Sequence, residues 1–100
     1  MNTQAMVKKA IENKMLLDFE YEGQHRIGEP HVLGTSHDKV QVLVWQTEGR
    51  TTSNDDDLPN WRRFNITDME KLKVLDESFS ARDMGKGAPF DKLIATTWEE

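Results

Sequence analysis

The segment from Tyr21 to Phe64 constrains the fold most, because short strand-like runs alternate there with turn residues. Three such runs lie at residues 25–34, 40–46 and 61–64. Short runs that are apolar or alternating, and that are bounded by glycine and polar residues, are typical of β-strands. The first run carries an arginine, the second a tryptophan, and the third an arginine pair beside aromatic residues. We therefore expect a small twisted sheet that gathers arginines and aromatic side chains at one site.

The residues ahead of this segment predict an α-helix over residues 3–14. Apolar residues recur there at spacings of three and four: Val7, Ala10, Ile11 and Met15. This spacing places the apolar side chains on one face of a helix. Asn2 or Thr3 is suited to cap the first turn with a side-chain oxygen.

The period then changes to two. Apolar and acidic residues alternate over residues 17–22, which predicts a half-buried strand. A short turn at residues 22–24 leads to a hairpin partner over residues 25–33, and a second turn is expected at residues 34–39. Pro30 cannot donate to a ladder, so we expect its strand to lie at a sheet edge or to contain a bulge.

The second half of the chain is expected to contain three more strands, a long loop and one helical turn. Residues 40–46 form the clearest strand, and apolar groups on both of its faces predict a central position. A long polar loop is expected over residues 47–60, followed by a strand at residues 61–66. The sequence Thr67-Asp68-Met69-Glu70 fits a capping box and predicts one helical turn before a last strand at residues 72–75.

The order of a helix, about five strands and a tail predicts the fold class. Five short strands bury their apolar side chains economically when they curl into a small barrel. We therefore expect an α+β, mainly β fold in which residues 1–79 form an N-terminal helix and an SH3-like (Sm-like) five-stranded β-barrel. Residues 80–100 are a C-terminal extension, made of a flexible connection around Gly85-Lys86-Gly87 and an apolar element at residues 90–98. That element fits a helix or a strand.

Composition narrows the class of protein. One hundred residues make one small domain, and 13 Lys and Arg against 18 Asp and Glu leave a net charge of −5. This charge argues against a protein that coats nucleic acid non-specifically, because that affinity depends on many cationic contacts. The absence of cysteine excludes disulfides and thiolate metal sites, and points to a cytoplasmic protein. No apolar run approaches the length of a membrane span.

The candidate binding residues are led by three arginines, Arg26, Arg62 and Arg63. A guanidinium group offers a planar donor fork to phosphate or carboxylate, and it stacks on bases and aromatic rings. Neighbouring residues of a strand point to opposite faces, so Arg62 and Arg63 cannot both share a pocket with Arg26. The alternative is that these arginines are solvated, or pair with the many acidic residues of the chain.

Other residue types could complete the same site. Tyr21 offers a stacking face, as do Trp45 and Trp61, although a chain this short also needs its large aromatic residues for the core. His31 and Gln46 are expected to supply hydrogen bonds. His25, His31 and His37 are interpreted as solvated or hydrogen-bonded histidines, so no metal site is predicted.

The remaining motifs do not indicate catalysis. The Asp55-Asp56-Asp57 run lacks the alternating ligands of a calcium loop, and we expect a solvated loop that could screen a basic pocket. Nucleophile motifs are lacking as well, so we expect neither an enzyme nor a cofactor.

Several of these segments together resemble the WYL domain. Residues 26–34 (Arg-Ile-Gly-Glu-Pro-His-Val-Leu-Gly) are similar to that family's R-x-x-x-P strand and the Leu-Gly that follows, and residues 17–21 after the Ala10-Ile11 helix are similar to its opening. Residues 42–46 stand where the family has its Trp-Tyr-Leu strand, although the triplet itself is absent. Residues 61–66 and 72–79 are similar to the later strands.

The resemblance covers roughly residues 7–79 and implies an SH3-like barrel that binds a ligand. In the WYL family that ligand is often nucleic acid or a nucleotide, and the proteins are bacterial regulators or defence-linked proteins. Most WYL regulators carry a winged-helix DNA-binding domain ahead of the barrel, so only the binding module is expected to carry over to these residues.

The sequence thus leads to two hypotheses. The first is a non-enzymatic sensor module that binds a nucleotide or a short single-stranded nucleic acid through Tyr21, Arg26, His31, Gln46 and Arg62 or Arg63. The second is a protein-interaction or homodimerisation module that acts through residues 84–100, because an open strand edge and an apolar tail suit docking.

Overall fold

The computed structural model, which describes residues 2–49, 60–80, 90 and 92–97, begins with the predicted helix. Helix α1 spans Thr3–Asn13, and its three buried residues are Val7, Ala10 and Ile11. Asn2 caps the first turn, because its Oδ1 accepts a hydrogen bond from the backbone N–H of Ala5 at 2.8 Å. The prediction of the helix and of this cap is confirmed.

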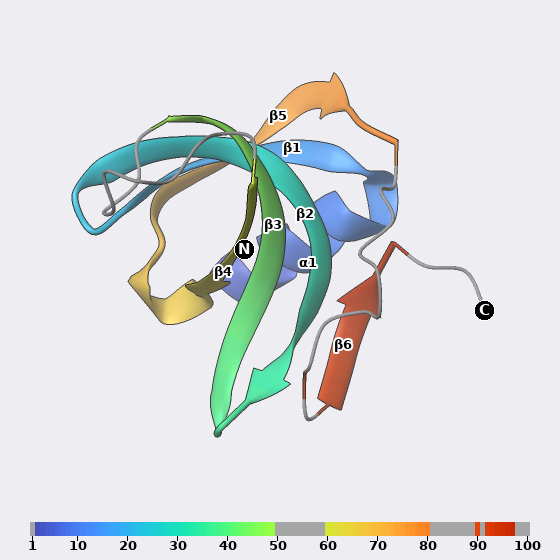
Figure 1. Ribbon diagram of the computed structural model, residues 1–100. Coiled ribbons are helices and arrows are strands. Elements are labelled where there is room, and N and C mark those ends of the chain that lie inside the picture. Colours follow the sequence, from blue (N-terminus) through green and yellow to red (C-terminus); the bar gives the residue numbers. More distant parts are fainter. Residues whose placement is uncertain (1, 50–59, 81–89, 91, 98–100) are drawn as a thin grey trace.

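An antiparallel sheet makes up most of the described chain (Figure 1). Its strands are β1 Met15–Tyr21, β2 Gln24–Ser36, β3 Lys39–Gly49, β4 Asn60–Asn65, β5 Glu70–Ser78 and β6 Lys92–Thr96. Five of them lie in the order β4-β3-β2-β1-β5, and β6 pairs with β2 outside this path. The long strand β2 therefore has β3 along one side, while β1 and then β6 share the other side.

Two tight turns set the registers of the first three strands. Glu22 and Gly23 connect β1 to β2 with φ of 54° and 76°, and His37 and Asp38 connect β2 to β3 with φ of 51° and 66°. Two-residue turns in which both residues have positive φ match the right-handed twist of the strands that they join. Both predicted turns are confirmed, and both are two residues long.

Irregular pairing bends the sheet. Between Pro30 and Val32 the pairing with β3 shifts, and His31 is the extra residue on β2. A second shift leaves Thr47 as the extra residue on β3. Extra residues of this kind bend a strand and increase its twist. The bulge predicted at Pro30 is confirmed. On the side of β2 away from β3, the pairing with β1 ends at Gly28 and that with β6 begins at Val32, so Pro30 has no ladder partner there among the described residues.

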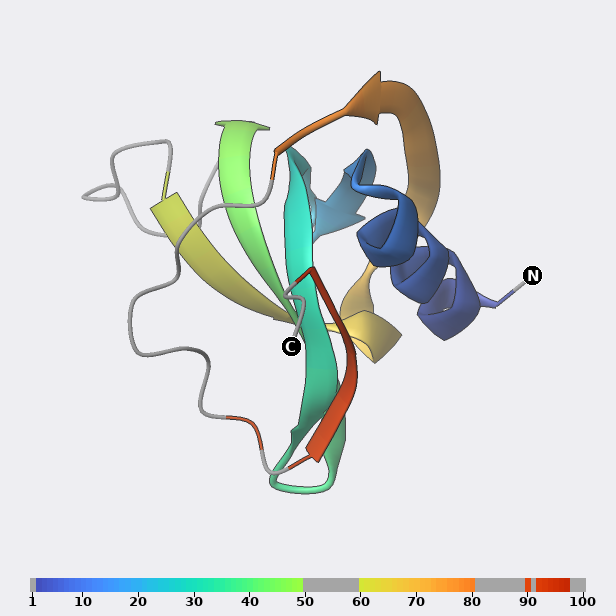
Figure 2. The same ribbon diagram turned by 90° about the vertical axis from the view of Figure 1, so that its right-hand side faces the viewer.

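The sheet is open, so the expected five-stranded barrel is wrong. Strands β4 and β5 end the strand order on opposite sides and do not pair with each other in the described part of the chain. The apolar face is covered in another way, because α1 inserts Val7, Ala10 and Ile11 against the bent sheet. Figure 2 shows α1 lying along one side of the sheet, near β1 and β5. Packing of a helix on the sheet thus replaces closure of the sheet on itself.

The C-terminal half differs from its prediction in two details. The single helical turn is the 3-10 helix η1 at Ile66–Asp68, with Asn65 as N-cap and no side-chain cap bond, so the capping box predicted at Thr67 is wrong. The apolar tail is a strand, β6, which belongs to the same sheet. Residues 50–59, with the aspartate run, and residues 81–89 of the expected connection lie outside the described residues.

The core lies between α1 and the inner face of the sheet, the face that carries the following buried residues. They are Leu17, Phe19, Leu33, Val42, Val44 and Phe64, joined by Ile66 and Met69 next to η1. The two phenylalanine rings meet edge to face, with centroids 5.0 Å apart. The face that carries this core is the reference for the positions of the candidate binding residues.

Candidate functional site

The strand registers place three of the candidate residues on the inner face. Residues directly opposite each other in antiparallel strands point to the same side of a sheet. Arg26 lies opposite Phe19, and Arg62 lies opposite the core residue Val44. Gln46 lies opposite Gly28, two residues along β2 from Arg26. Arg26, Gln46 and Arg62 therefore share the face that buries the core, at the end where β1 turns into β2.

Arg26 is the centre of this arrangement because it is only 2% exposed. Its guanidinium carbon lies 5.4 Å from the centroid of the Tyr21 ring and 5.3 Å from that of Phe64, within range of cation–π attraction. Its Nη2 donates a long hydrogen bond of 3.4 Å to the Tyr21 carbonyl. Its Nε is buried and has no hydrogen-bond partner among the described residues.

The electrostatics of Arg26 are unfavourable for a cation. Burial lowers the pKa of Arg26, and the positive charge of Arg62 lowers that pKa further, while Glu22 and Tyr21 act in the opposite direction. Desolvation and a nearby like charge both disfavour the charged form of a base. Since arginine remains protonated in proteins, this end of the inner face holds a buried positive charge that an anion would stabilise.

Tyr21 supports the site from the edge. Its hydroxyl oxygen accepts a hydrogen bond from the backbone N–H of Asn65 at 3.1 Å, and its ring meets Phe64 edge to face at 4.7 Å. Tyr21 also lines a surface cavity of about 520 Å³ together with Glu22, Gly23, Asn65, Thr67, Asp68 and Glu70. The acidic rim of that cavity repels anions, so the Tyr21 ring separates an acidic surface from the buried cation.

His31 lies on the outer face of the sheet, away from Arg26. It is the extra residue of the β2 bulge and is fully buried, and its Nδ1 lies 2.9 Å from the carbonyl oxygen of Glu29, an acceptor. Its ring contacts Trp61 at 4.9 Å and Phe79 at 5.0 Å between centroids. His31 and Arg26 are five residues apart on β2, so the alternation of strand side chains places them on opposite faces.

Arg63 and the two candidate tryptophans also lie on the outer face. Trp45 and Trp61 lie opposite each other, with ring centroids 5.0 Å apart. The guanidinium carbon of Arg63 lies 4.4 Å from the centroid of the Phe90 ring, and its Nη1 is 3.5 Å from Gln41 Oε1. Arg63 thus contacts Phe90, two residues before the start of β6, and Arg62 is the one of the pair that lies on the face of Arg26.

Two residues that lie near Arg26 on the inner face were not predicted from the sequence. Phe64 supports both Tyr21 and Arg26, and Gln24 lies opposite Tyr21 with a buried Oε1 that has no hydrogen-bond partner among the residues described. Period two along β2 would have placed Gln24 on the face of Arg26 once the turn was known to contain only Glu22 and Gly23. Phe64 gave no signal that distinguished it from an ordinary core residue.

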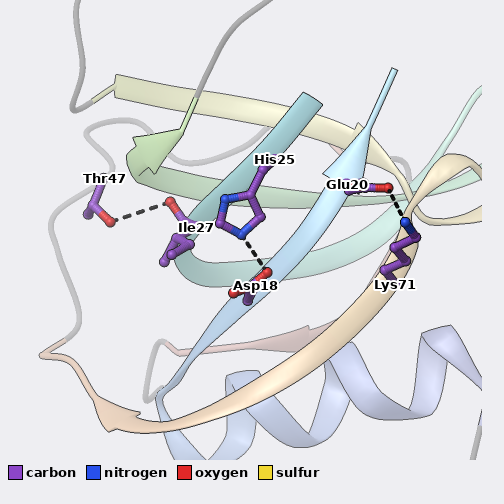
Figure 3. A network of polar contacts seen from close by, with 6 residues as sticks. All are labelled: Asp18, Glu20, His25, Ile27, Thr47 and Lys71. Carbon is purple, nitrogen blue, oxygen red and sulfur yellow. Dashed lines mark hydrogen bonds and ion pairs between the residues drawn. The ribbon is translucent and has the colours of Figure 1, made fainter. Parts of the chain in front are cut away.

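A polar network covers the outer side of β1, β2 and β5 (Figure 3). His25 Nε2 lies 2.7 Å from Asp18 Oδ1, and Lys71 Nζ lies 3.4 Å from Glu20 Oε2. The described residues contain no group of three or more His, Asp or Glu side chains that could hold a metal ion. His25 is an exposed side chain that contacts Asp18.

Another cavity lies elsewhere, between α1 and β5. It measures about 710 Å³ and is lined by Met6, Lys9, Asn13, Met15 and Val74. Its walls are mainly apolar, and Val74 is 39% exposed. This groove contains none of the candidate binding residues, so it is a separate surface.

Comparisons with known proteins leave the chain without an assigned family. No family model matches the sequence, and neither a curated protein nor a solved structure matches the chain. Over the described residues, no helix is long and apolar enough to cross a membrane.

Proposed function

We propose that the chain is a non-enzymatic binding module for an anionic ligand, namely a nucleotide or a short single-stranded nucleic acid. The observation that carries this proposal is Arg26, which is buried, charged and left with a partnerless Nε. An arginine with a purely structural role is normally paired with a carboxylate, and no ion pair to Arg26 is found within the described residues. A phosphate oxygen at Nε would supply the missing acceptor and the missing negative charge.

The neighbours of Arg26 support an anion over a neutral ligand. Arg62 adds a second positive charge on the same face, and its repulsion is relieved when an anion binds between the two groups. Gln46 adds a fully buried amide. The resemblance to the WYL domain favours the same class of ligand and a sensor role in bacterial regulation or defence, in the cytoplasm.

The proposal is tested by isothermal titration calorimetry of the full chain with mononucleotides and short single-stranded oligonucleotides at low and physiological salt. We expect saturable binding that weakens with salt and is lost in Arg26→Gln. Arg63→Gln is the matched control, because it removes the same charge on the outer face and should bind normally. Calorimetry is preferred to tryptophan fluorescence because Trp45 and Trp61 lie on the face opposite Arg26. Equal binding by the wild type and a folded Arg26→Gln protein would refute the assignment.

A second candidate function, protein interaction, is favoured by the apolar groove between α1 and β5. The exposed Val74 in the groove and Leu93 on β6, which is 45% exposed, are the large hydrophobic residues left open to solvent in the described chain. Deleting residues 84–100 is a poor test of this idea, since it also removes β6 from the sheet. Light scattering of Val74→Lys and Leu93→Lys is cleaner. Self-association that disappears in either folded variant would support this function, and a monomeric wild type would remove the homodimer version of it.

A further inference from the structure

We infer that the Arg26 site takes the terminal phosphate of its ligand, a phosphate monoester at the end of a nucleotide or strand, and not an internal phosphodiester. This inference rests on the proposed function and specifies which part of the ligand enters. Its basis is the enclosure of the donor. Arg26 is 2% exposed and Gln46 is fully buried on the same face, so a phosphate has to penetrate below the surface to meet them.

The surroundings of the guanidinium restrict how a phosphate can approach. The rings of Tyr21 and Phe64 lie within 5.4 Å of its central carbon, and Nη2 is directed to the Tyr21 carbonyl. Nε is thus a donor that a ligand can use, since it has no partner among the described residues. A buried donor group flanked by two aromatic rings suits a compact end group.

The shape of the two kinds of phosphate then decides between them. An internal phosphodiester carries a sugar on each side, so its oxygens could reach Nε only if both sugars entered the enclosure. A terminal monoester has one sugar and three unsubstituted oxygens, and it can enter end-on. Burying the extra polar sugar without hydrogen bonds costs free energy.

The charge of the phosphate favours the same choice. A monoester carries about −1.5 to −2 charges near pH 7, whereas a diester carries about −1. The repulsion between Arg26 and Arg62 is relieved more fully by the larger negative charge. A terminal phosphate therefore compensates more of the buried positive charge than a diester does.

The test compares ligands that differ only in a terminal phosphate, using the full chain. One single-stranded oligonucleotide is titrated with a phosphate at its 5′ end, at its 3′ end or at neither end, and a nucleoside is compared with its 5′-monophosphate. We expect at least one phosphorylated form of the oligonucleotide, or the mononucleotide, to bind about tenfold or more tightly than its unphosphorylated form. The mononucleotide arm distinguishes a free nucleotide from a strand end as the source of the phosphate.

A second readout locates the effect. In ¹⁵N-labelled protein, the Nε–H resonance of Arg26 should shift when a phosphorylated ligand is added and stay unchanged with the unphosphorylated one, and Arg63 serves as the internal control. Equal affinity for the phosphorylated and unphosphorylated forms, with binding still lost in Arg26→Gln, overturns this inference and leaves the anion-binding function intact. Absence of binding by every ligand overturns both.

Discussion

The same residue types have different surroundings on the two faces of the sheet. On the inner face, Arg26 is buried between Tyr21 and Phe64 with an unused donor. On the outer face, Arg63 lies against Phe90 and contacts Gln41 through its Nη1. The Arg63 guanidinium contacts two residues of the protein, Phe90 and Gln41. The Arg26 guanidinium keeps an Nε donor that can bind an acceptor on a ligand.

The comparison teaches that exposure and unused hydrogen-bonding capacity distinguish the two arginines, while residue type does not. Arg62 and Arg63 are adjacent in the chain and yet belong to different environments, since strand side chains alternate between faces. The same alternation places His31, five residues after Arg26 on β2, on the outer face. Four substitutions test how far the two faces differ, and they are arranged by the size of the expected effect.

Phe64→Ala is expected to have the largest effect. Phe64 is 2% exposed and packs edge to face with Phe19 and Tyr21, so truncation should lower the free energy of unfolding by about 3–5 kcal/mol. Phe79→Ala on the outer face is the control and should cost less, because that ring is only half-buried. Urea unfolding measures both. A greater loss at Phe79 would show that the outer face carries the core of the domain.

Gly28→Ala tests how tightly the inner face is packed beneath Arg26. A Cβ at Gly28 would lie 2.4 Å from Val44 Cγ1 and 2.8 Å from the Trp45 carbonyl oxygen. Because Trp45 is held there by backbone pairing, the contact cannot be relieved by a side chain alone, and we expect a loss of about 1–3 kcal/mol. Thermal and urea unfolding check this, and unchanged stability would mean that β2 and β3 separate easily.

Arg26→Met should separate binding from stability. In phosphate-free buffer we expect no loss of stability, or a gain of about 1 kcal/mol, because a methionine avoids the cost of burying a charge with an unused donor. Arg63→Met should instead cost up to about 1 kcal/mol through its contact with Phe90.

The pH dependence of this difference follows from the lowered pKa of Arg26. The unfolded chain binds the Arg26 proton more tightly than the folded chain does, so the penalty is fully present at all pH values below the folded-state pKa. It is relieved only as the pH rises through the alkaline window toward the ordinary value. Urea midpoints of wild type and Arg26→Met should therefore differ by a constant amount between pH 6 and 8, and a marked loss of stability in Arg26→Met would show that the arginine is structural.

Asp18→Asn is expected to have the smallest effect. The pair between Asp18 and His25 lies on the outer face, where the His25 side chain is 56% exposed, and exposed pairs contribute roughly 0.2–1 kcal/mol. We expect a loss near the lower end of this range that shrinks further in high salt. A loss that does not respond to salt would argue for a packing role of Asp18.

The elements that the sequence predicted well are those determined by local patterns. Apolar spacing of three and four produced α1, and the short polar Asn2 produced its cap. Glycine and polar residues marked the two hairpins at residues 22–24 and 34–39, and the structure narrows the turns to Glu22-Gly23 and His37-Asp38. Alternation also predicted that Arg62 and Arg63 would face opposite sides, and the registers confirm it.

The errors concern contacts between elements that are distant in the chain. Whether β4 and β5 pair could not be read from either segment, since it depends on the helix that covers the inner face. The tail at residues 90–98 had apolar spacing that fitted a helix and β-branched residues that left a strand possible, and the pairing of residues 92–96 with β2 decided for a strand. The His31 prediction was wrong for a different reason: His31 and Arg26 are an odd number of residues apart on one strand, so alternation alone already places them on opposite faces.

The sequence by itself determined the local elements, the hairpin turns and the residue types available for binding an anion. Only the tertiary structure decided that Arg26 is enclosed and that Arg62, not Arg63, lies on its face. The physical reason is that local propensity and periodicity act over a few residues. Burial, desolvation and like-charge repulsion instead depend on which strands are brought together.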